Sequence, residues 1–356
     1  MRKNAKDTHS PQKSKNELLW SVLSVAIAAG TIWAVVSQSR FFSFDSFLSY
    51  ILGTSKVWLA AAVASMLCFI FFEGEAVIAV CRAFGYRVGH RQGFVYSASD
   101  IYFSAITPSA SGGQPACAYF MIRDGIPGSV AAVALIANLT MYTMAILVIG
   151  LFTLFTHPRI FLYFDHLSKT LIVLGYITQS VLSVFFLMLL VKNKFLHSLC
   201  CKALHFLCKV KILRNEEEKQ RKLDQYMEEY AQYAQMIKGH KKAMINVFIF
   251  NLLQRLSIIS VSLFVFLASG GELVKAASIW AIQCYAVIGS NTIPIPGAMG
   301  ISDYIMLDGF NNLMWVHNAV NFELLSRSLS FYVCVILCGV TTLVQYLKQK
   351  KQERKI

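Results

Sequence analysis

The chain has few charged residues and few prolines for its length. Of its 356 residues only 15% are charged and 56% are hydrophobic, whereas charged residues make up about 25% of an ordinary soluble protein. So little polar surface could not cover a soluble core of this size, and the apolar content excludes a disordered chain. The composition therefore predicts an all-α membrane protein that crosses the bilayer several times.

Paired cysteines are also absent. The chain has nine cysteines but no C-x-x-C pair, and five of the nine lie in apolar runs. Cys200, Cys201 and Cys208, with His197 and His205, could be read as a metal cluster, but their spacing matches no common zinc pattern. We expect unpaired, reduced thiols, with no metal and no cofactor.

Six apolar runs are long enough to span a membrane, since a spanning helix needs about 20 apolar residues. A basic N-terminal tail precedes the first run, which is too long for the apolar region of a signal peptide, so we expect an uncleaved helix. The predicted spans are 18–39, 57–80, 129–155, 170–191, 243–268 and 324–347.

Two further apolar stretches, 93–120 and 276–310, are interrupted by proline and glycine. Four of the seven prolines fall in these two breaks. Proline removes a backbone donor and disturbs the preceding helical turn. Non-helical backbone at membrane depth survives only inside protein or beside a watery cavity. We therefore predict two broken helical hairpins.

The basic residues predict the orientation of these segments. The tails 1–17 and 348–356 are basic, and the loop 192–242 holds twelve Lys or Arg residues. Cytoplasmic segments carry such an excess. By this rule the first hairpin enters from the cytoplasm and the second from outside. The membrane halves 18–191 and 243–347 would then form an inverted repeat; eight full spans remain the alternative.

This distribution also explains the formal charge of +14. The charges lie in loops and tails, where they suit anionic lipid head groups, and we expect no nucleic acid to bind. Within the loop, Asn215 caps a predicted helix that ends at Gly239. Its apolar stripe consists of Leu223, Met227, Tyr230, Ala234 and Ile237. This amphipathic helix would dock on the bundle or the lipid surface, or pack within its own loop.

Ionisable residues inside the predicted spans and hairpins are functional candidates, because a charge at the bilayer centre costs at least about 2.5 kcal/mol. Glu73 and Glu75 lie two positions apart, so they point to different sides of a helix. Arg255 lies at mid-depth in the span equivalent to theirs, and a Glu–Arg pair between the two spans is expected. Such a pair could serve transport or could merely lock the two halves together.

The breaks supply the remaining candidates. The first offers free backbone groups, hydroxyls and an amide, and the second leads into a helix N-terminus that suits an anion. Nearby carboxylates suit a cation, so an aminoacylated phospholipid fits both. The predicted lipid-binding residues are Glu73, Asp100, Pro108, Ser109, Ser111, Gly112, Gly113, Gln114, Pro115, Arg255, Pro294, Pro296, Gly297, Gly300 and Asp303.

Catalytic motifs are missing from the sequence. It contains no Gly-rich loop ending in Lys-Ser or Lys-Thr, no His-Glu-x-x-His and no G-x-S-x-G. ATP hydrolysis, zinc proteolysis and serine hydrolysis are therefore unsupported.

The motif Thr107-Pro-Ser-Ala-Ser-Gly-Gly-Gln-Pro115, with Ile293-Pro-Ile-Pro-Gly-Ala-Met-Gly300 and Asp303, resembles the lysylphosphatidylglycerol synthase transmembrane family. This family forms the flippase-like membrane part of bacterial phosphatidylglycerol lysyltransferase, also called multiple peptide resistance factor. The resemblance extends over about 18–347. It differs at Ala298 and Asp303, where relatives more often carry Gly and Glu.

The resemblance implies a multi-pass protein of the bacterial cytoplasmic membrane, with both termini in the cytoplasm, that moves phosphatidylglycerol or lysyl-phosphatidylglycerol between leaflets. Full-length relatives carry a C-terminal aminoacyltransferase domain. This chain ends soon after its last apolar run, so we expect that domain to be absent or supplied by a separate soluble partner. The alternatives are lysyltransferase activity, with resistance to cationic peptides, and a lipid-binding subunit that does not transport.

Overall fold

The computed structural model describes residues 44–107, 110–209, 216–290, 300–314 and 316–353, and every regular element in them is helical. They belong to one of the two units into which the chain divides, Ser43–Ile356. The predicted first span, 18–39, and the basic N-terminal tail lie outside the described residues. The prediction of an all-α, multi-pass helical bundle is confirmed.

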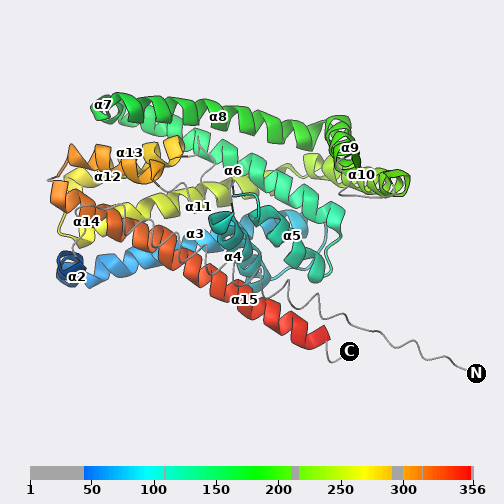
Figure 1. Cartoon of the computed structure of the whole chain (residues 1–356), viewed down its shortest axis with the longest axis horizontal. Helices are drawn as coiled ribbons and strands as arrows, with labels where there is room; N and C mark the ends of the chain where they lie inside the picture. The colour runs from blue at the N-terminus through cyan, green and yellow to red at the C-terminus, as the bar shows by residue number, and fades with distance from the viewer. Residues whose placement is uncertain (1–43, 108–109, 210–215, 291–299, 315, 354–356) are drawn as a thin grey trace, which may run out of the picture. The chain divides into compact units, whose positions relative to one another are not determined.

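Six described helical segments are long and apolar enough to cross a membrane. Five of them coincide with predicted spans, and their bounds are α3 Lys56–Ala83, α6 Gly128–Thr156, α8 His166–Val191, α11 Lys241–Ala268 and the stretch Asn318–Lys351. The last combines α14 (Val316–Arg327), the π-helix η3 (Ser328–Val333) and α15 (Cys334–Glu353) in one rod (Figure 1).

The sixth candidate span is α12, Leu273–Ser290, which the sequence analysis assigned to the first arm of the second hairpin. Its 18 residues extend about 27 Å at 1.5 Å per residue. That length approaches the hydrocarbon thickness of about 30 Å. Both alternatives, a re-entrant arm and a full span, thus stay open for this segment.

The long helices run antiparallel, and contacts between their ends identify two ends of the bundle. At one end the start of α3 meets the finish of α11, where Ser55 N donates to Ala268 O at 2.7 Å. At the other end Gln349 of α15 donates to Asp124, which follows α5, at 3.2 Å. We call this second end, where α3, α8 and α15 finish, the basic end, because Arg82, Lys192 and Lys350 lie there.

Two helical hairpins enter the bundle from opposite ends. The first consists of α4 (His90–Ile106) and α5 (Gly113–Arg123), which lie between the finish of α3 and the start of α6. The second consists of α12 and α13 (Ile301–Asn311), which lie between the finish of α11 and the start of α14. The two hairpins therefore begin at opposite ends of the bundle, as an inverted repeat requires.

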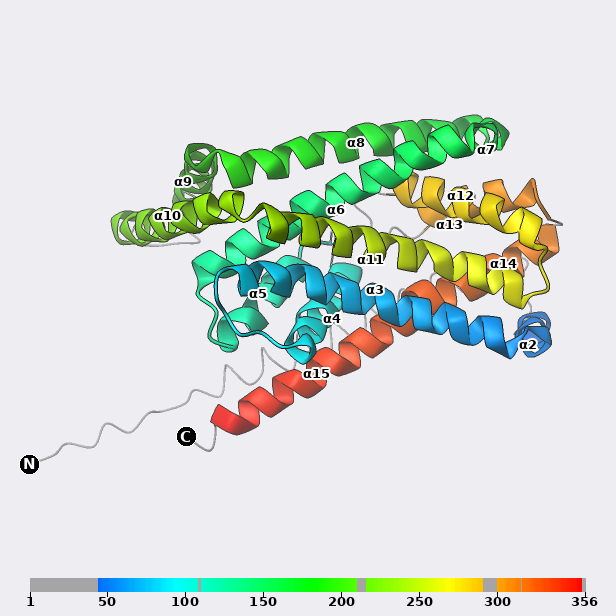
Figure 2. The ribbon, with the colours of Figure 1, turned by 180° about the vertical axis from the view of Figure 1, so that it is seen from behind.

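The centre of the bundle is the pair α3 and α11, which lie side by side (Figure 2). Small residues let α4 approach α3: a Cβ on Gly74 would lie only 2.4 Å from the carbonyl oxygen of Gly93. Such contacts between small residues are the usual means of close packing between membrane helices. The first hairpin is therefore held against the central pair by backbone contact.

The outer helix α8 presents an apolar face that no described residue covers. Its exposed side chains include Val173, Leu174, Ile177, Val181 and Val184. This stripe recurs every three to four residues, so it forms one face of the helix. A large exposed apolar face at this position suits contact with lipid.

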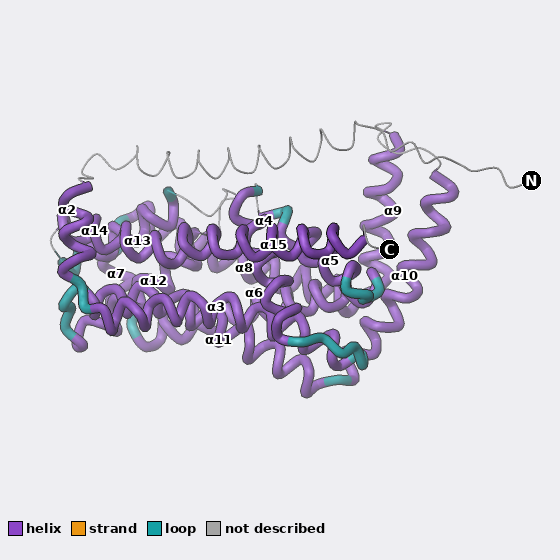
Figure 3. Tube along the Cα trace, turned by 90° about the horizontal axis from the view of Figure 1, so that it is seen from below, coloured by secondary structure: helices purple, strands orange, loops and turns teal. Residues whose placement is uncertain are grey.

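The predicted loop 192–242 contains two helices, α9 (Asn193–Lys209) and α10 (Glu216–Gly239), which lie side by side (Figure 3). The apolar stripe of α10 packs on the bundle, since Tyr230, Ala234 and Ile237 are buried in its core. The alternative of docking on the bundle is thus the one observed. Asn215, the predicted cap, lies outside the described residues, and helix α9 had no counterpart in the sequence analysis.

Two short helices complete the description. Helix α2, Phe44–Gly53, precedes α3, and helix α7, Pro158–Tyr163, joins α6 to α8. Asp165 then caps α8, with its carboxylate accepting from Ser168 N at 2.6 Å. A carboxylate at this position satisfies one of the free N–H groups of the helix start.

Candidate functional site

The break of the first hairpin brings together three of the predicted lipid-binding residues. Asp100 of α4 accepts from Gln114 Nε2 at 2.7 Å and from Ser104 Oγ at 3.1 Å. The carboxyl group of Glu73 on α3 is a further hydrogen-bond partner of Asp100. Two carboxyl groups can form such a bond only when one carries a proton. We call Glu73, Asp100 and Gln114 the first carboxyl cluster.

Gly113 makes this cluster possible. A Cβ at this position would lie 1.9 Å from Asp100 Oδ1 and 2.1 Å from Ser104 Oγ. These separations are well inside van der Waals contact, so a larger residue would push the carboxylate away. The preceding Gly112 N donates to Thr107 Oγ1 at 2.9 Å, which closes the turn across the break. Ala110 in the same turn has a φ of 53°, a conformation that is strained for a residue with a side chain.

The side chain of Gln114 has one acceptor atom without a hydrogen bond in the described part of the chain. Its Oε1 is buried and has no hydrogen-bond partner among the described residues. A buried acceptor without a partner costs free energy, typically about 1–3 kcal/mol. Because the amide nitrogen of the same side chain is bonded to Asp100 at the break, this oxygen could accept from a ligand donor there.

Arg255 lies near the first cluster but does not form the ion pair that the sequence predicted. Gln254 Nε2 donates to Glu73 Oε2 at 3.1 Å, and Arg255 Nε donates to Gln254 Oε1 at 3.1 Å. The guanidinium stacks over Tyr142, with 4.3 Å from its carbon to the ring centroid. The Glu–Arg pair expected between the two spans is thus not a direct contact of Glu73: the amide of Gln254 lies between the two charged groups, and an aromatic face contacts the cation.

Glu75, two residues from Glu73, belongs to a different network. Its carboxylate pairs with Arg82 and His90, near the basic end. Glu75 therefore lies outside the first carboxyl cluster, on a different side of the helix from Glu73. Both are buried, with exposed fractions of 8% for Glu73 and 5% for Glu75, so burial alone does not distinguish them.

The break of the second hairpin carries a similar group. Asp303, in the first turn of α13, accepts from Gly300 N at 2.9 Å and pairs with Arg327 Nε at 2.6 Å. The carboxyl group of Glu323 on α14 is a hydrogen-bond partner of Asp303. We call Asp303, Glu323 and Arg327 the second carboxyl cluster. Gly300 caps α13 with a φ of 80°, in the region that favours glycine.

Sequence reasoning missed Glu323 and gave Arg327 no role. Glu323 stands one residue before the predicted last span, 324–347, so it was not counted as intramembrane. The structure buries it to 5% exposure. Its spacing of four from Arg327, on one face of a helix, was the available signal. The π-helix η3 follows Arg327 directly, and such segments occur often at functional sites.

Both clusters thus contain a pair of carboxyl groups. Each joins a carboxyl on a hairpin to a second carboxyl on a neighbouring long helix: Asp100 with Glu73, and Asp303 with Glu323. An arginine lies close to each, indirectly at Arg255 and directly at Arg327. Because the two hairpins enter from opposite ends of the bundle, each cluster occupies the equivalent position in one of the two inverted halves.

The remaining predicted residues have other placements. Ser111 and Pro115 are exposed beside the first break, and Gly112 is half-buried in its turn. Pro108, Ser109, Pro294, Pro296 and Gly297 lie outside the described residues. A separate group of possible metal ligands occurs on α9 and α10.

Comparison with family models matches residues 21–338 to the lysylphosphatidylglycerol synthase TM region. Comparison with curated proteins gives no match. Since the family model extends over most of the chain, the chain belongs to this family, as the two break motifs predicted. It is a multi-pass membrane protein related to the membrane part of a phospholipid lysyltransferase.

Proposed function

We propose that this member of the lysylphosphatidylglycerol synthase TM family moves an aminoacylated anionic phospholipid, of the lysyl-phosphatidylglycerol type, from one leaflet to the other. The observation that carries the proposal is the carboxyl pair at the break of each hairpin, in which Glu73, Asp100 and Glu323 are buried and Asp303 is half-buried. Ionisable groups in a membrane bundle commonly mark a substrate path. Broken helices at matching positions of inverted halves commonly hold the transported group.

The chemistry of the clusters suits a zwitterionic head group. A hydrogen bond between the carboxyl groups of Glu73 and Asp100 requires one proton on the pair, and a lipid ammonium group could replace that proton and keep the charge balanced. Gln114 Oε1 is a further acceptor for the same group. Arg255 and Arg327, with their five N–H donors each, suit the phosphodiester.

The opposed hairpins give the two clusters different access. The first hairpin enters at the basic end and the second at the other end. A head group could therefore meet one cluster from each leaflet, with movement of a hairpin opening one path at a time. Transport of this kind requires no nucleotide, in keeping with the missing ATP motif.

We place the basic end in the cytoplasm of a bacterial cell, together with both termini. The support is the positive-inside rule, because the loop 192–242 and the tail 348–356 carry most of the basic residues. A basic surface on this side would also gather anionic lipid before it enters the bundle.

Reconstitution in liposomes tests the proposal. Fluorescent phosphatidylglycerol, lysyl-phosphatidylglycerol and phosphatidylcholine would be placed in both leaflets, and a reducing agent that does not cross the membrane would bleach the outer one. We expect the protein to make the inner lysyl-lipid accessible faster than the phosphatidylcholine. Equal accessibility in protein-containing and empty liposomes, for all three lipids, would overturn the proposal.

The family description supports a second candidate, synthesis of the lysyl-lipid itself, alone or with a separate soluble aminoacyltransferase. Lipid analysis of a host that expresses only this chain distinguishes the two. New lysyl-phosphatidylglycerol would favour synthesis. Lipid binding to the purified protein without any movement between leaflets would instead favour a subunit that does not transport.

A further inference from the structure

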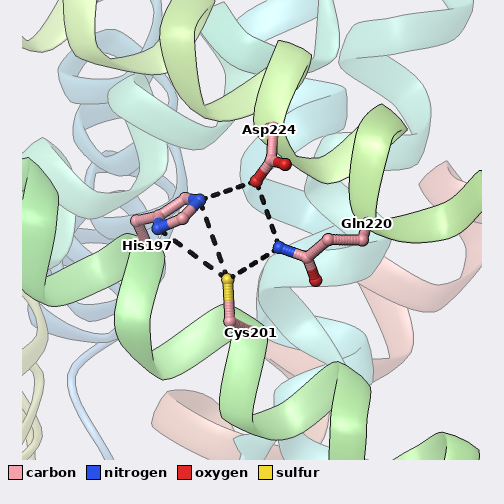
Figure 4. A network of polar contacts seen from close by, with 4 residues as sticks. All are labelled: His197, Cys201, Gln220 and Asp224. Carbon is pink, nitrogen blue, oxygen red and sulfur yellow. Dashed lines mark hydrogen bonds and ion pairs between the residues drawn. The ribbon is translucent and has the colours of Figure 1, made fainter. Parts of the chain in front are cut away.

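Four polar side chains meet between α9 and α10, outside the transmembrane bundle (Figure 4). His197 and Cys201 lie four residues apart on α9, and Gln220 and Asp224 lie four residues apart on α10. Residues at this spacing share one face of a helix. The two helices turn these faces toward each other, so four polar groups converge from two elements.

The distances fit a small coordination sphere. Cys201 Sγ lies 3.7 Å from His197 Nε2, and Asp224 Oδ1 lies 2.7 Å from the same nitrogen. One ligand atom from each of the three residues lies within 4.8 Å of the others. With metal–ligand bonds of about 2.0–2.3 Å, tetrahedral ligand atoms lie about 3.3–3.6 Å apart. The sulfur–nitrogen distance already fits, and the nitrogen–oxygen distance needs to open by about half an ångström.

Gln220 is not one of the three possible ligands, but it contacts two of them. Its Nε2 lies 3.1 Å from Cys201 Sγ and 3.1 Å from Asp224 Oδ1, so one amide can donate to both. Donors of this kind orient ligands around bound metals and are needed for affinity. Gln220 is thus a positioning residue.

We propose that His197, Cys201 and Asp224 form a binding site for a transition-metal ion of the zinc class, which joins α9 to α10. Thiolate and imidazole ligands select such metals over magnesium or calcium, and the carboxylate contributes a third, negatively charged ligand. Three protein ligands leave a fourth position for water. The side chains of His197 and Asp224 are 42% and 47% exposed, so the ion and water can reach the site.

The metal would stabilise the position of α9, which makes few contacts with the membrane-spanning helices. Helix α10 is anchored to the finish of α8, where Tyr230 Oη donates to Leu189 O at 3.2 Å and Lys238 Nζ donates to Val191 O at 2.9 Å. Helix α9 contacts chiefly α10. Metal binding would therefore connect α9 to the bundle through α10. This inference is independent of lipid transport.

Cobalt substitution of the purified full-length protein tests the site, because Co²⁺ takes the place of zinc and absorbs visible light. We expect one Co²⁺ per chain, with intense tetrahedral bands and a thiolate-to-cobalt charge-transfer band, and its displacement by Zn²⁺. Competition with a calibrated chelator would measure the affinity for Zn²⁺.

Variants assign the ligands. Cys201→Ser should remove the charge-transfer band. His197→Gln and Asp224→Asn should each weaken Zn²⁺ binding by more than about tenfold, because loss of a residue that only hydrogen-bonds to a metal ligand already weakens binding by about that factor. The matched control is Cys200→Ser, because the neighbouring thiol is half-buried and lies outside the group of possible ligands. This variant should bind as the wild type does.

A second measurement on the wild type avoids the question of whether a variant folds. Chelation should increase protease cleavage in residues 192–215, and added Zn²⁺ should restore protection. The proposal is overturned if Cys201→Ser keeps the wild-type cobalt spectrum, or if wild type and Cys200→Ser bind no metal. In either case the four residues form only a hydrogen-bonded network.

Discussion

Arg327 Nε lies 2.6 Å from Oδ1 of Asp303, and this contact joins the last turn of α14 to the first turn of α13. The two residues are 12% and 21% exposed. Glu323, one turn before Arg327, contacts the same aspartate. The pair thus fixes the second hairpin to the last spanning rod, beside the π-helix η3. Its removal should affect both stability and transport.

Arg327→Gln should destabilise the protein. It leaves two acidic groups without their cation, and loss of one partner of a buried ion pair costs about 3–5 kcal/mol. Because both side chains remain partly exposed to solvent, we expect a loss at the lower end of that range. Thermal unfolding in detergent measures the loss as a lower midpoint. The double variant Asp303→Asn/Arg327→Gln should recover part of it, and Arg159→Gln, an exposed arginine, should leave the midpoint unchanged. A double variant no more stable than Arg327→Gln would contradict the pairing.

Gly113→Ala should abolish movement of lipid. The added Cβ would lie 1.9 Å from Asp100 Oδ1, so the carboxylate must leave its place between Glu73 and Gln114. Gly128→Ala is the control, because its Cβ meets only Ile122 at 3.8 Å. Lipid accessibility in liposomes should fall for the first variant and not for the second. Equal rates would show that the geometry of the first break does not matter.

Ala234→Asp should detach α10 from the bundle. Ala234 is fully buried among apolar residues, and burying an unpaired charge is strongly unfavourable. Limited proteolysis should then cleave within Glu216–Gly239, whereas the docked helix of the wild type should resist cleavage. Gln235→Asp changes the exposed neighbouring position and should retain protection. Cleavage at equal rates in all three proteins would mean that α10 is not docked in solution.

Asp165 predicts a pH dependence at the end opposite the basic end. Slight desolvation raises the pKa of this carboxyl, but hydrogen bonds from Tyr304 and Ser168 outweigh it, and its pKa is lower than usual. A depressed pKa contributes stability above the unfolded value of about 3.9, and this contribution is lost as the pH falls toward the folded value. The stability gap between wild type and Asp165→Asn should therefore stay constant above about pH 4 and shrink below it. Melting curves between neutral and acidic pH measure the gap, with Glu272→Gln, an exposed acid, as control. A gap that widens on acidification would contradict the assignment.

Much of the fold follows from the sequence because membrane helices obey strong local rules. The length of the apolar runs predicted α3, α6, α8, α11 and the last rod. The positions of the basic residues predicted which ends of these helices lie on the same side of the bundle. The glycine and proline clusters marked both hairpins. In each case a single segment carries the signal, so no knowledge of distant partners is needed.

The site could be predicted only in part, because its geometry depends on contacts between distant segments. Asp100 and Gln114 were found from one motif, but nothing local shows that Gln254 separates Glu73 from Arg255. Glu323 was missed because a boundary drawn by hydropathy fell beside it. Asp224 was missed as a partner of His197 and Cys201 because it comes from another helix.

The central claim is that the carboxyl clusters carry the lipid head group, and two glutamates of one helix test it most directly. Glu73 and Glu75 are two residues apart and similarly buried, but only Glu73 belongs to a cluster. The measurement is the rate at which labelled lysyl-phosphatidylglycerol crosses between leaflets in liposomes that contain each variant. A hydrogen bond to a charged group contributes about 1.5–3 kcal/mol, so Glu73→Gln should slow this rate by about tenfold or more, whereas Glu75→Gln should retain it. A Glu73→Gln variant that moves lipid as fast as Glu75→Gln and wild type would contradict the account.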